Sequence, residues 1–186
     1  HVAEEMFERA GGKGLATDAK FPTPAAADPA ALAAEDYLRS VLEDIQTVRK
    51  LANIESPSSL TLFTTPNWKR DLTAKAVSMA QAAGGKFPMG QFMSEAMADP
   101  HLRALGKFVQ TFTSKLPSQV TQFSPSQRAI LISGADEAQI LAAAAEFIAA
   151  EVGVAKVEVY RADAPSAPDH AKKGVAGPLK PGIALA

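Results

Sequence analysis

Two strand-like segments separated by a helical segment lie between residues 129 and 161, and this order is the strongest constraint on the fold. Residues 129–132 are a continuous apolar run that is closed by Ser133 and Gly134, which favours a buried strand. Residues 136–152 place apolar side chains on one helical face, and residues 155–161 have the composition of a second strand. This order predicts a β-α-β unit with a parallel strand pair and a right-handed crossover.

The remaining segments add helices and short strands to this unit. Apolar positions repeat every three or four residues over 33–53, which predicts a helix, and Glu35 is spaced to pair with Arg39. Residues 60–64 predict a short strand. We expect Thr65 to cap the next helix and Pro66 to take its first position. The other expected elements are three helices and an edge strand, over residues 68–83, 89–98, 102–123 and 181–186. The predicted fold is mixed α/β (α+β), with helices packed on a sheet of three or four strands.

The first third of the chain has a different character. A helical pattern is already present over residues 2–10 and stops at Gly11, so we expect the chain to be a piece of a longer protein. Residues 11–34 are rich in proline and alanine without a period, which predicts a linker. The expected organisation is a helical tail with this linker over residues 1–55 and an α/β domain over residues 56–186.

Composition argues against most kinds of catalytic site. The absence of cysteine excludes disulfides, thiolate metal sites and cysteine nucleophiles. The three histidines are far apart in sequence, the serines at 56–59 and 124–126 have no nearby histidine, and no phosphate-binding loop occurs. We therefore expect no catalytic residue, no metal and no cofactor in this segment. No apolar run approaches the roughly 18 residues of a membrane span, so we expect a cytoplasmic protein with no membrane partner.

Charge is distributed unevenly along the chain. The net charge is −1, but residues 56–128 contain eight basic and three acidic residues. Within them, Trp68, Lys69 and Arg70 stand at the expected start of a helix, where free N–H groups favour phosphate. Trp68 as a core residue that docks its helix is the competing interpretation. A cationic stripe, or simply a solvated face, is expected at Arg103, Lys107 and Lys115.

Six segments, taken in order, resemble the C-terminal end of leucyl-tRNA synthetases of the archaeal and eukaryotic type. They are HVAEEMF (1–7), AEDYL with VLEDI (34–45), TPNWK (65–69), KFP to DPHL (86–102), VEVY (157–160) and LKPGI (179–183). Family members often end in a pattern with a tyrosine and an acid, whereas this chain ends in Ile183-Ala184-Leu185-Ala186. Base-specific contacts by these last residues are therefore not expected.

The resemblance implies a non-catalytic segment of an enzyme that joins leucine to its tRNA. ATP and magnesium would act in upstream domains of the same polypeptide, and residues 1–55 would end an anticodon-binding helical bundle. This segment would bind tRNA(Leu), at the elbow and the long variable arm, mainly through phosphates and shape, and not DNA. The candidate tRNA-binding residues are Trp68, Lys69, Arg70, Arg103, Lys107, Lys115, Lys172, Lys173, Lys180, Leu185 and Ala186. A protein–protein docking module of a larger cytosolic assembly is the alternative.

Overall fold

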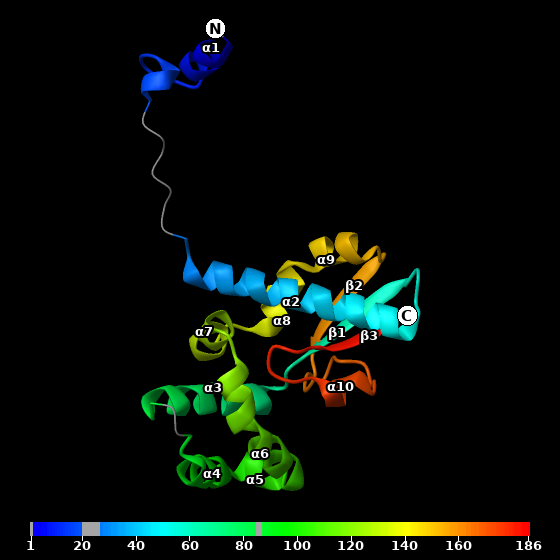
Figure 1. Ribbon diagram of the computed structural model, residues 1–186. Helices are drawn as coiled ribbons and strands as arrows, with labels where there is room; N and C mark the ends of the chain where they lie inside the picture. Colours follow the sequence, from blue (N-terminus) through cyan, green and yellow to red (C-terminus); the bar gives the residue numbers. More distant parts are fainter. Residues whose placement is uncertain (1, 20–26, 85–86) are drawn as a thin grey trace.

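The sheet has three strands in the order β2-β1-β3. The computed structural model describes residues 2–19, 27–84 and 87–186. The central strand β1 (Ser59–Thr64) pairs in parallel with β2 (Lys156–Arg161) and antiparallel with β3 (Gly182–Leu185) (Figure 1). This arrangement confirms the predicted mixed fold, the two strands around residues 60 and 158, and the final edge strand.

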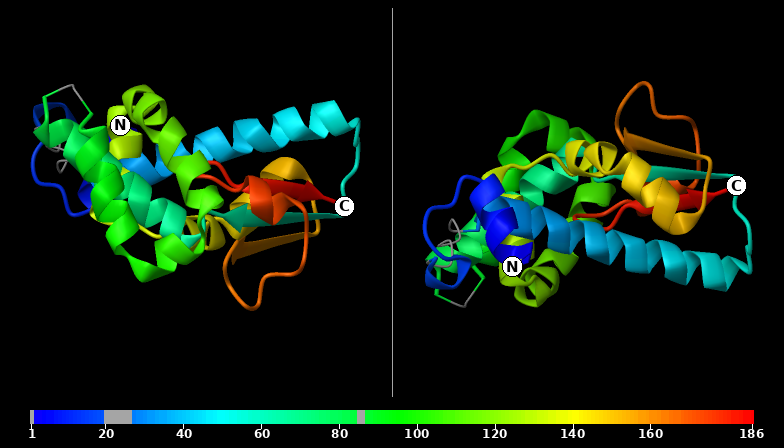
Figure 2. Two further views of the ribbon diagram at one scale, coloured as in Figure 1. Left: turned by 90° about the horizontal axis from the view of Figure 1, so that it is seen from below. Right: turned by 90° about the horizontal axis from the view of Figure 1, so that it is seen from above.

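The two faces of the sheet are covered by different parts of the chain. Leu60 and Leu62 are fully buried and belong to a core that includes α2 (Pro29–Ala52) and α9 (Ala145–Val152). Phe63 points the other way, into a small cluster below the short helix α10 (Lys172–Val175). Figure 2 shows α10 on one face of the sheet and α9 on the opposite face. Side chains alternate along β1, as expected for a strand with both faces covered.

The helix α2 forms as the apolar repeat predicts and begins earlier than expected. Asp28 accepts a hydrogen bond from the Ala30 N–H (2.9 Å) and Pro29 takes the first helical position, so helix starts inside the expected linker. The predicted pair of Glu35 and Arg39 is present at 3.3 Å. The linker prediction is therefore wrong for residues 29–34, and residues 20–26 lie outside the described part. Before them, α1 (Val2–Arg9) contacts the short 3-10 helix η1 (Ala16–Asp18).

Residues 129–132 are helical, so the prediction of a strand there is wrong. They lie in α7 (Pro125–Ser133), which Ser124 and Gln127 start with a reciprocal capping box. Ile130 and Leu131 are buried where α7 packs between α2 and α3 (Asn67–Ala82). The parallel pair is β1 with β2, and the crossover between them contains all the helices from α3 to α9.

Two other predicted helices are each divided in the structure. The segment 102–123 forms α5 (Pro100–Ala104) and α6 (Lys107–Gln122), because Gly106 has a left-handed φ of 51° between them. Pro117 lies within α6 without ending it. The segment 136–152 forms α8 (Glu137–Ala143) and α9, which are separated at Ala144. The helix α4 (Met89–Ala98) has the predicted bounds.

The turn from β1 into α3 differs from the prediction in two ways. Pro66 is the residue before the first helical residue, and Thr65 does not cap the helix. Instead, the Thr65 hydroxyl lies 2.6 Å from the Gly177 carbonyl oxygen and 3.0 Å from the Glu137 carboxylate. Thr65 therefore ties the end of β1 to the turn before β3. That turn lies beside α10, in a segment expected to be only loop.

Candidate functional site

A groove opens where α3, α6 and the segment 173–178 meet, beyond the end of β1. Its volume is about 810 Å³, within the range of ordinary ligand clefts. Two walls are helices from the crossover, and the third is the segment that leads into β3. The lining residues are Pro66, Trp68, Lys69, Phe108, Thr111, Phe112, Lys115, Gln119, Ala162, Asp163 and residues 173–178.

Trp68 and Phe112 form the aromatic floor of the groove. Their rings meet edge to face with centroids 5.4 Å apart, which joins the start of α3 to the middle of α6. Trp68 is half-buried and packs against the hydrophobic core, while part of its side chain lines the groove. Trp68 therefore both packs against the core and lines the groove.

Lys69 ties the floor of the groove to its third wall. Its Nζ donates to the Ala176 carbonyl oxygen at 2.7 Å and lies 5.6 Å from the Trp68 ring centroid. It also lies 5.9 Å from the Phe112 centroid, so the ammonium contributes to two cation–π contacts. Burial lowers the pKa of Lys69 from its usual range. Lys69 is therefore a positioning residue for the groove, and its charge adds to the positive potential there.

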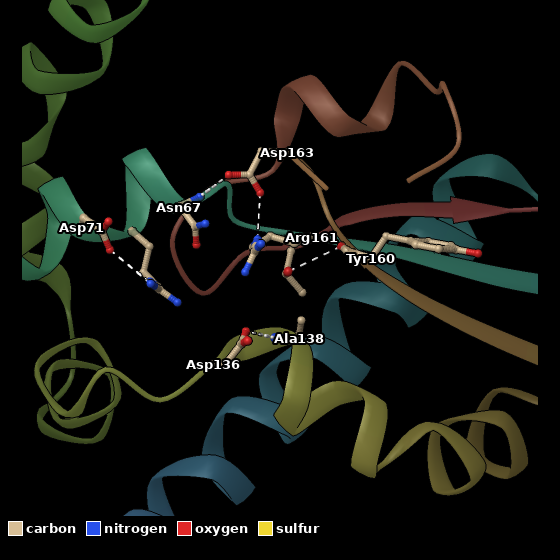
Figure 3. Close-up of polar contacts among 9 residues, drawn as sticks. Asn67, Asp71, Asp136, Ala138, Tyr160, Arg161 and Asp163 are labelled. Atoms are coloured by element: carbon tan, nitrogen blue, oxygen red, sulfur yellow. Dashed lines mark hydrogen bonds and ion pairs between the residues drawn. The ribbon is translucent and has the colours of Figure 1, made fainter. Parts of the chain in front are cut away.

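Lys115 and Lys173 supply positive charge from opposite walls. Lys115 is exposed on α6, and the Nζ of Lys173 lies 3.4 Å from the Ala167 carbonyl oxygen. Asp163 is the carboxylate that lines the groove, and both of its oxygens are engaged. It accepts from the Asn67 N–H at 2.9 Å and from Arg161 Nε at 2.9 Å (Figure 3). The groove thus combines three lysines with one carboxylate already held by two donors.

A second hollow on the other side of Trp68 has the opposite character. It has a volume of about 710 Å³ and lies between α3, α4 and α5. Four carboxylates line it, from Asp71, Glu95, Asp99 and Asp163. Its lysine, Lys75, is paired with Glu95 at 2.5 Å. A phosphate would be repelled here, so the lysine-lined groove is the better candidate for an anion.

Comparison with known proteins finds relatives over nearly the whole chain. No protein-family model matches the chain. The leucine–tRNA ligase of Methanothrix thermoacetophila is 31% identical over 185 residues, which are 98% of this chain and 18% of that protein. The leucine–tRNA ligase of Pyrococcus furiosus is 30% identical over 185 residues, 98% of this chain and 17% of that protein. This chain is similar to archaeal leucine–tRNA ligases over 98% of its length.

This match confirms the resemblance to leucyl-tRNA synthetases drawn from the order of six segments. The chain spans between 17% and 19% of the length of the leucine–tRNA ligases that it matches, including that of Methanosarcina barkeri at 28% identity. Such a partial match is consistent with a C-terminal region of a class I synthetase. Within the described ranges, no helix is both long and apolar enough to cross a membrane.

Four of the candidate tRNA-binding residues of this leucine–tRNA ligase relative meet in the groove: Trp68, Lys69, Lys115 and Lys173. Three others lie near it without lining it. Arg70 pairs with Asp71 at 3.2 Å, Lys107 is exposed at the start of α6, and Lys172 is exposed on α10. The structure therefore brings four of the predicted residues, which come from three separate segments of the chain, together in one groove.

The other candidates do not line the groove. Arg103 donates to the Met97 carbonyl oxygen at 2.9 Å, and the break at Gly106 divides the expected stripe between two helices. Lys180 is exposed in the turn before β3. Leu185 pairs with Leu60 at the start of β1, and the Ala186 carbonyl oxygen accepts from the Ser59 N–H at 3.1 Å. These last two residues are at the opposite end of the sheet from Thr65 and the groove.

Sequence reasoning missed two exposed apolar residues of the groove, Phe108 and Val175. Their exposed fractions are 76% and 68%, and both side chains line the groove. The position of Phe108 could have been predicted from the spacing of the residues in this helix. Phe108, Phe112 and Lys115 are separated by four and three residues, so they share one helical face beside the buried stripe of Val109 and Leu116.

A buried carboxylate, that of Glu137, hydrogen-bonds to residues adjacent in sequence to the groove-lining residues Pro66 and 173–178. Glu137 is 3% exposed and accepts from the Leu179 N–H at 3.3 Å. Its other oxygen lies 3.0 Å from the Thr65 hydroxyl and 3.4 Å from that of Tyr37. Burial raises the pKa of Glu137 above its ordinary value, more than these hydrogen bonds lower it. Asp136 caps α8 through the Ala138 N–H at 2.9 Å, as expected for an acid at a helix start (Figure 3).

Proposed function

We propose that this chain is a non-catalytic tRNA-binding segment of a leucine–tRNA ligase and that the lysine-lined groove contacts the phosphate backbone of tRNA(Leu). The observation that carries the proposal is the convergence of Lys69, Lys115 and Lys173 with Trp68 in one groove. The relatives are named leucine–tRNA ligases, which supports tRNA as the anionic partner. Phosphate contacts of this kind position an RNA without reading its sequence.

The chemistry of leucylation would belong to other parts of the same polypeptide. We propose that ATP and magnesium act there, and that this segment holds the elbow or long variable arm of the tRNA in the cytoplasm. Its contribution to rate would be positional, because holding a large substrate in place lowers the entropic cost of reaction. Neither a membrane nor DNA is part of the proposal.

The test is the salt dependence of tRNA(Leu) binding to the 186-residue chain, measured by fluorescence anisotropy between about 50 and 200 mM salt. Each lysine that neutralises a phosphate contributes about 0.7 to 0.9 to the slope of log affinity against log salt. We therefore expect Lys115→Gln and Lys173→Gln each to lower this slope by about that amount. Circular dichroism would check that both variants keep their helical content.

A matched control is Lys50→Gln, because Lys50 is an exposed lysine in the last turn of α2 and does not line the groove. It should leave the slope unchanged. The alternative, a docking module for another protein, predicts no salt-sensitive binding of tRNA(Leu). Absence of binding at micromolar protein, or a slope that Lys50→Gln lowers as much as Lys115→Gln, would contradict the proposal.

A further inference from the structure

The groove presents an exposed aromatic ring beside its positive charges. Phe108 is 76% exposed at the start of α6, one helical turn before Phe112 and two turns before Lys115. Val175, 68% exposed, faces the groove from the third wall. A groove that only bound phosphates would need the lysines and not an exposed ring, because an ammonium contacts phosphate oxygens without apolar support.

The charge of the groove limits what can cover this ring. Three lysines line it against the single carboxylate of Asp163, which already accepts from Asn67 and Arg161. The occupant is therefore expected to be anionic and to carry a flat apolar group. A nucleotide has both parts at short range, since its base has an aromatic face and its phosphates are charged.

We propose that the groove takes an unpaired nucleotide of an RNA, with the base against Phe108 and the flanking phosphates near Lys115 and Lys173. This inference rests on the proposed function and makes it more specific. Bases of an A-form duplex are stacked inside the helix and display only their edges, so an aromatic side chain reaches a base face only where the strand is unpaired. Stacking is tolerant of sequence, because each base has an aromatic face.

The construction of the groove supports a base more than a flexible peptide side chain. Trp68 and Phe112 fix the floor behind Phe108, and Lys69 holds the opposite wall through the Ala176 carbonyl oxygen. Gly106 turns the chain so that α6 begins at Lys107, which puts Phe108 in the first turn at the edge of the groove. Because Phe108 belongs to a helix, its backbone is already ordered before a base binds, which lowers the entropic cost of binding.

The test compares two RNAs with the same number of nucleotides and phosphates: a duplex with a bulge of four unpaired nucleotides, and a fully paired duplex that is two base pairs longer. We expect the bulged RNA to bind the 186-residue chain more tightly. Phe108→Ala should reduce its affinity about 10-fold, since one stacked base contributes on the order of 1–3 kcal/mol. The affinity for the paired duplex should not change, and Phe108→Trp should keep the preference for the bulge.

Phe147→Ala is the matched control, because Phe147 is a 49% exposed phenylalanine on α9, on the other face of the sheet. It should leave both affinities unchanged. If Phe108→Ala has no effect while Lys115→Gln still lowers the salt slope, the unpaired nucleotide is excluded and the proposed function stands. If neither RNA binds, both fail. Tighter binding of an acidic phenylalanine-containing peptide, lost in Phe108→Ala, would overturn the inference in favour of protein docking.

Discussion

Replacing Glu137 with alanine is expected to lower the free energy of unfolding by about 4 kcal/mol. The change removes the acceptor of the buried Leu179 N–H and the partner of the Thr65 and Tyr37 hydroxyls, and it leaves a cavity. Because Glu137 joins α8, the end of β1 and the turn before β3, the loss also loosens the groove wall at residues 173–178. Urea unfolding monitored by circular dichroism measures the change.

Glu137→Gln is the matched variant, because the amide has the same shape and no charge. Its oxygen can accept from Leu179 N–H, and its NH2 can donate to Thr65, whose own hydrogen is directed at the Gly177 carbonyl oxygen 2.6 Å away. These are the contacts of a protonated Glu137. We therefore expect Glu137→Gln to be close to the wild type in acid, unlike Glu137→Ala.

The free energies of unfolding of the wild type and of Glu137→Gln should diverge as the pH rises. The folded pKa of Glu137 lies above its ordinary value of 4.5, so the folded state binds this proton more tightly than the unfolded state. The contribution of this tighter proton binding to the free energy of unfolding is fully present below pH 4.5. It is lost as the pH rises through the folded pKa of Glu137. Glu137→Gln should therefore gain stability relative to the wild type over this window. A difference that stays constant with pH would contradict the raised pKa.

Replacing Gly182 with alanine is expected to lower the free energy of unfolding by about 3 kcal/mol. Gly182 is buried at the start of β3, and a Cβ there would overlap the backbone carbonyl oxygen of Lys172 in α10. The backbone of Gly182 cannot move away on its own, because Gly182 pairs with Phe63 in the sheet. The α10 backbone at Lys172 would therefore have to be displaced. The same displacement would shift Lys173, so tRNA(Leu) affinity should fall together with stability.

The control for this prediction is Gly174→Ala. Gly174 lies within α10, and an added Cβ would meet nothing within 4 Å. Alanine is also the better helix former by about 1 kcal/mol, so this variant should be as stable as the wild type or slightly more so. Thermal unfolding of the three proteins checks the ranking. A Gly182→Ala protein that melts with the wild type would mean that α10 does not pack on β3.

The sequence predicted the elements whose signals are local. The 3.6-residue repeat of α2 and the strand-like composition of β1 and β2 needed no distant information, and the mixed α/β class followed from them. Residues 129–132 were misassigned because a run of four apolar residues fits a buried strand or a buried helix equally well. The deciding signal was the capping box at Ser124 and Gln127, which starts the helix at Pro125, four residues before this run.

The candidate groove was only partly predictable for a different reason. Trp68 and Lys69 were found because they stand together at a helix start. Their meeting with Lys173 depends on a tertiary contact, the bond of Lys69 to the Ala176 carbonyl oxygen, which no spacing in the sequence encodes. The same holds for Glu137, whose partners come from three distant segments.

The position of β1 in the sheet has a consequence for the order in which the chain folds. β1 pairs on one edge with residues 156–161 and on the other with residues 182–185. During synthesis, both edges of this apolar strand stay open until most of the helices that follow it have been made. Such late, non-local pairing slows folding and leaves an exposed strand edge prone to misassembly. A nascent chain stopped before residue 156 would carry a strand without a partner.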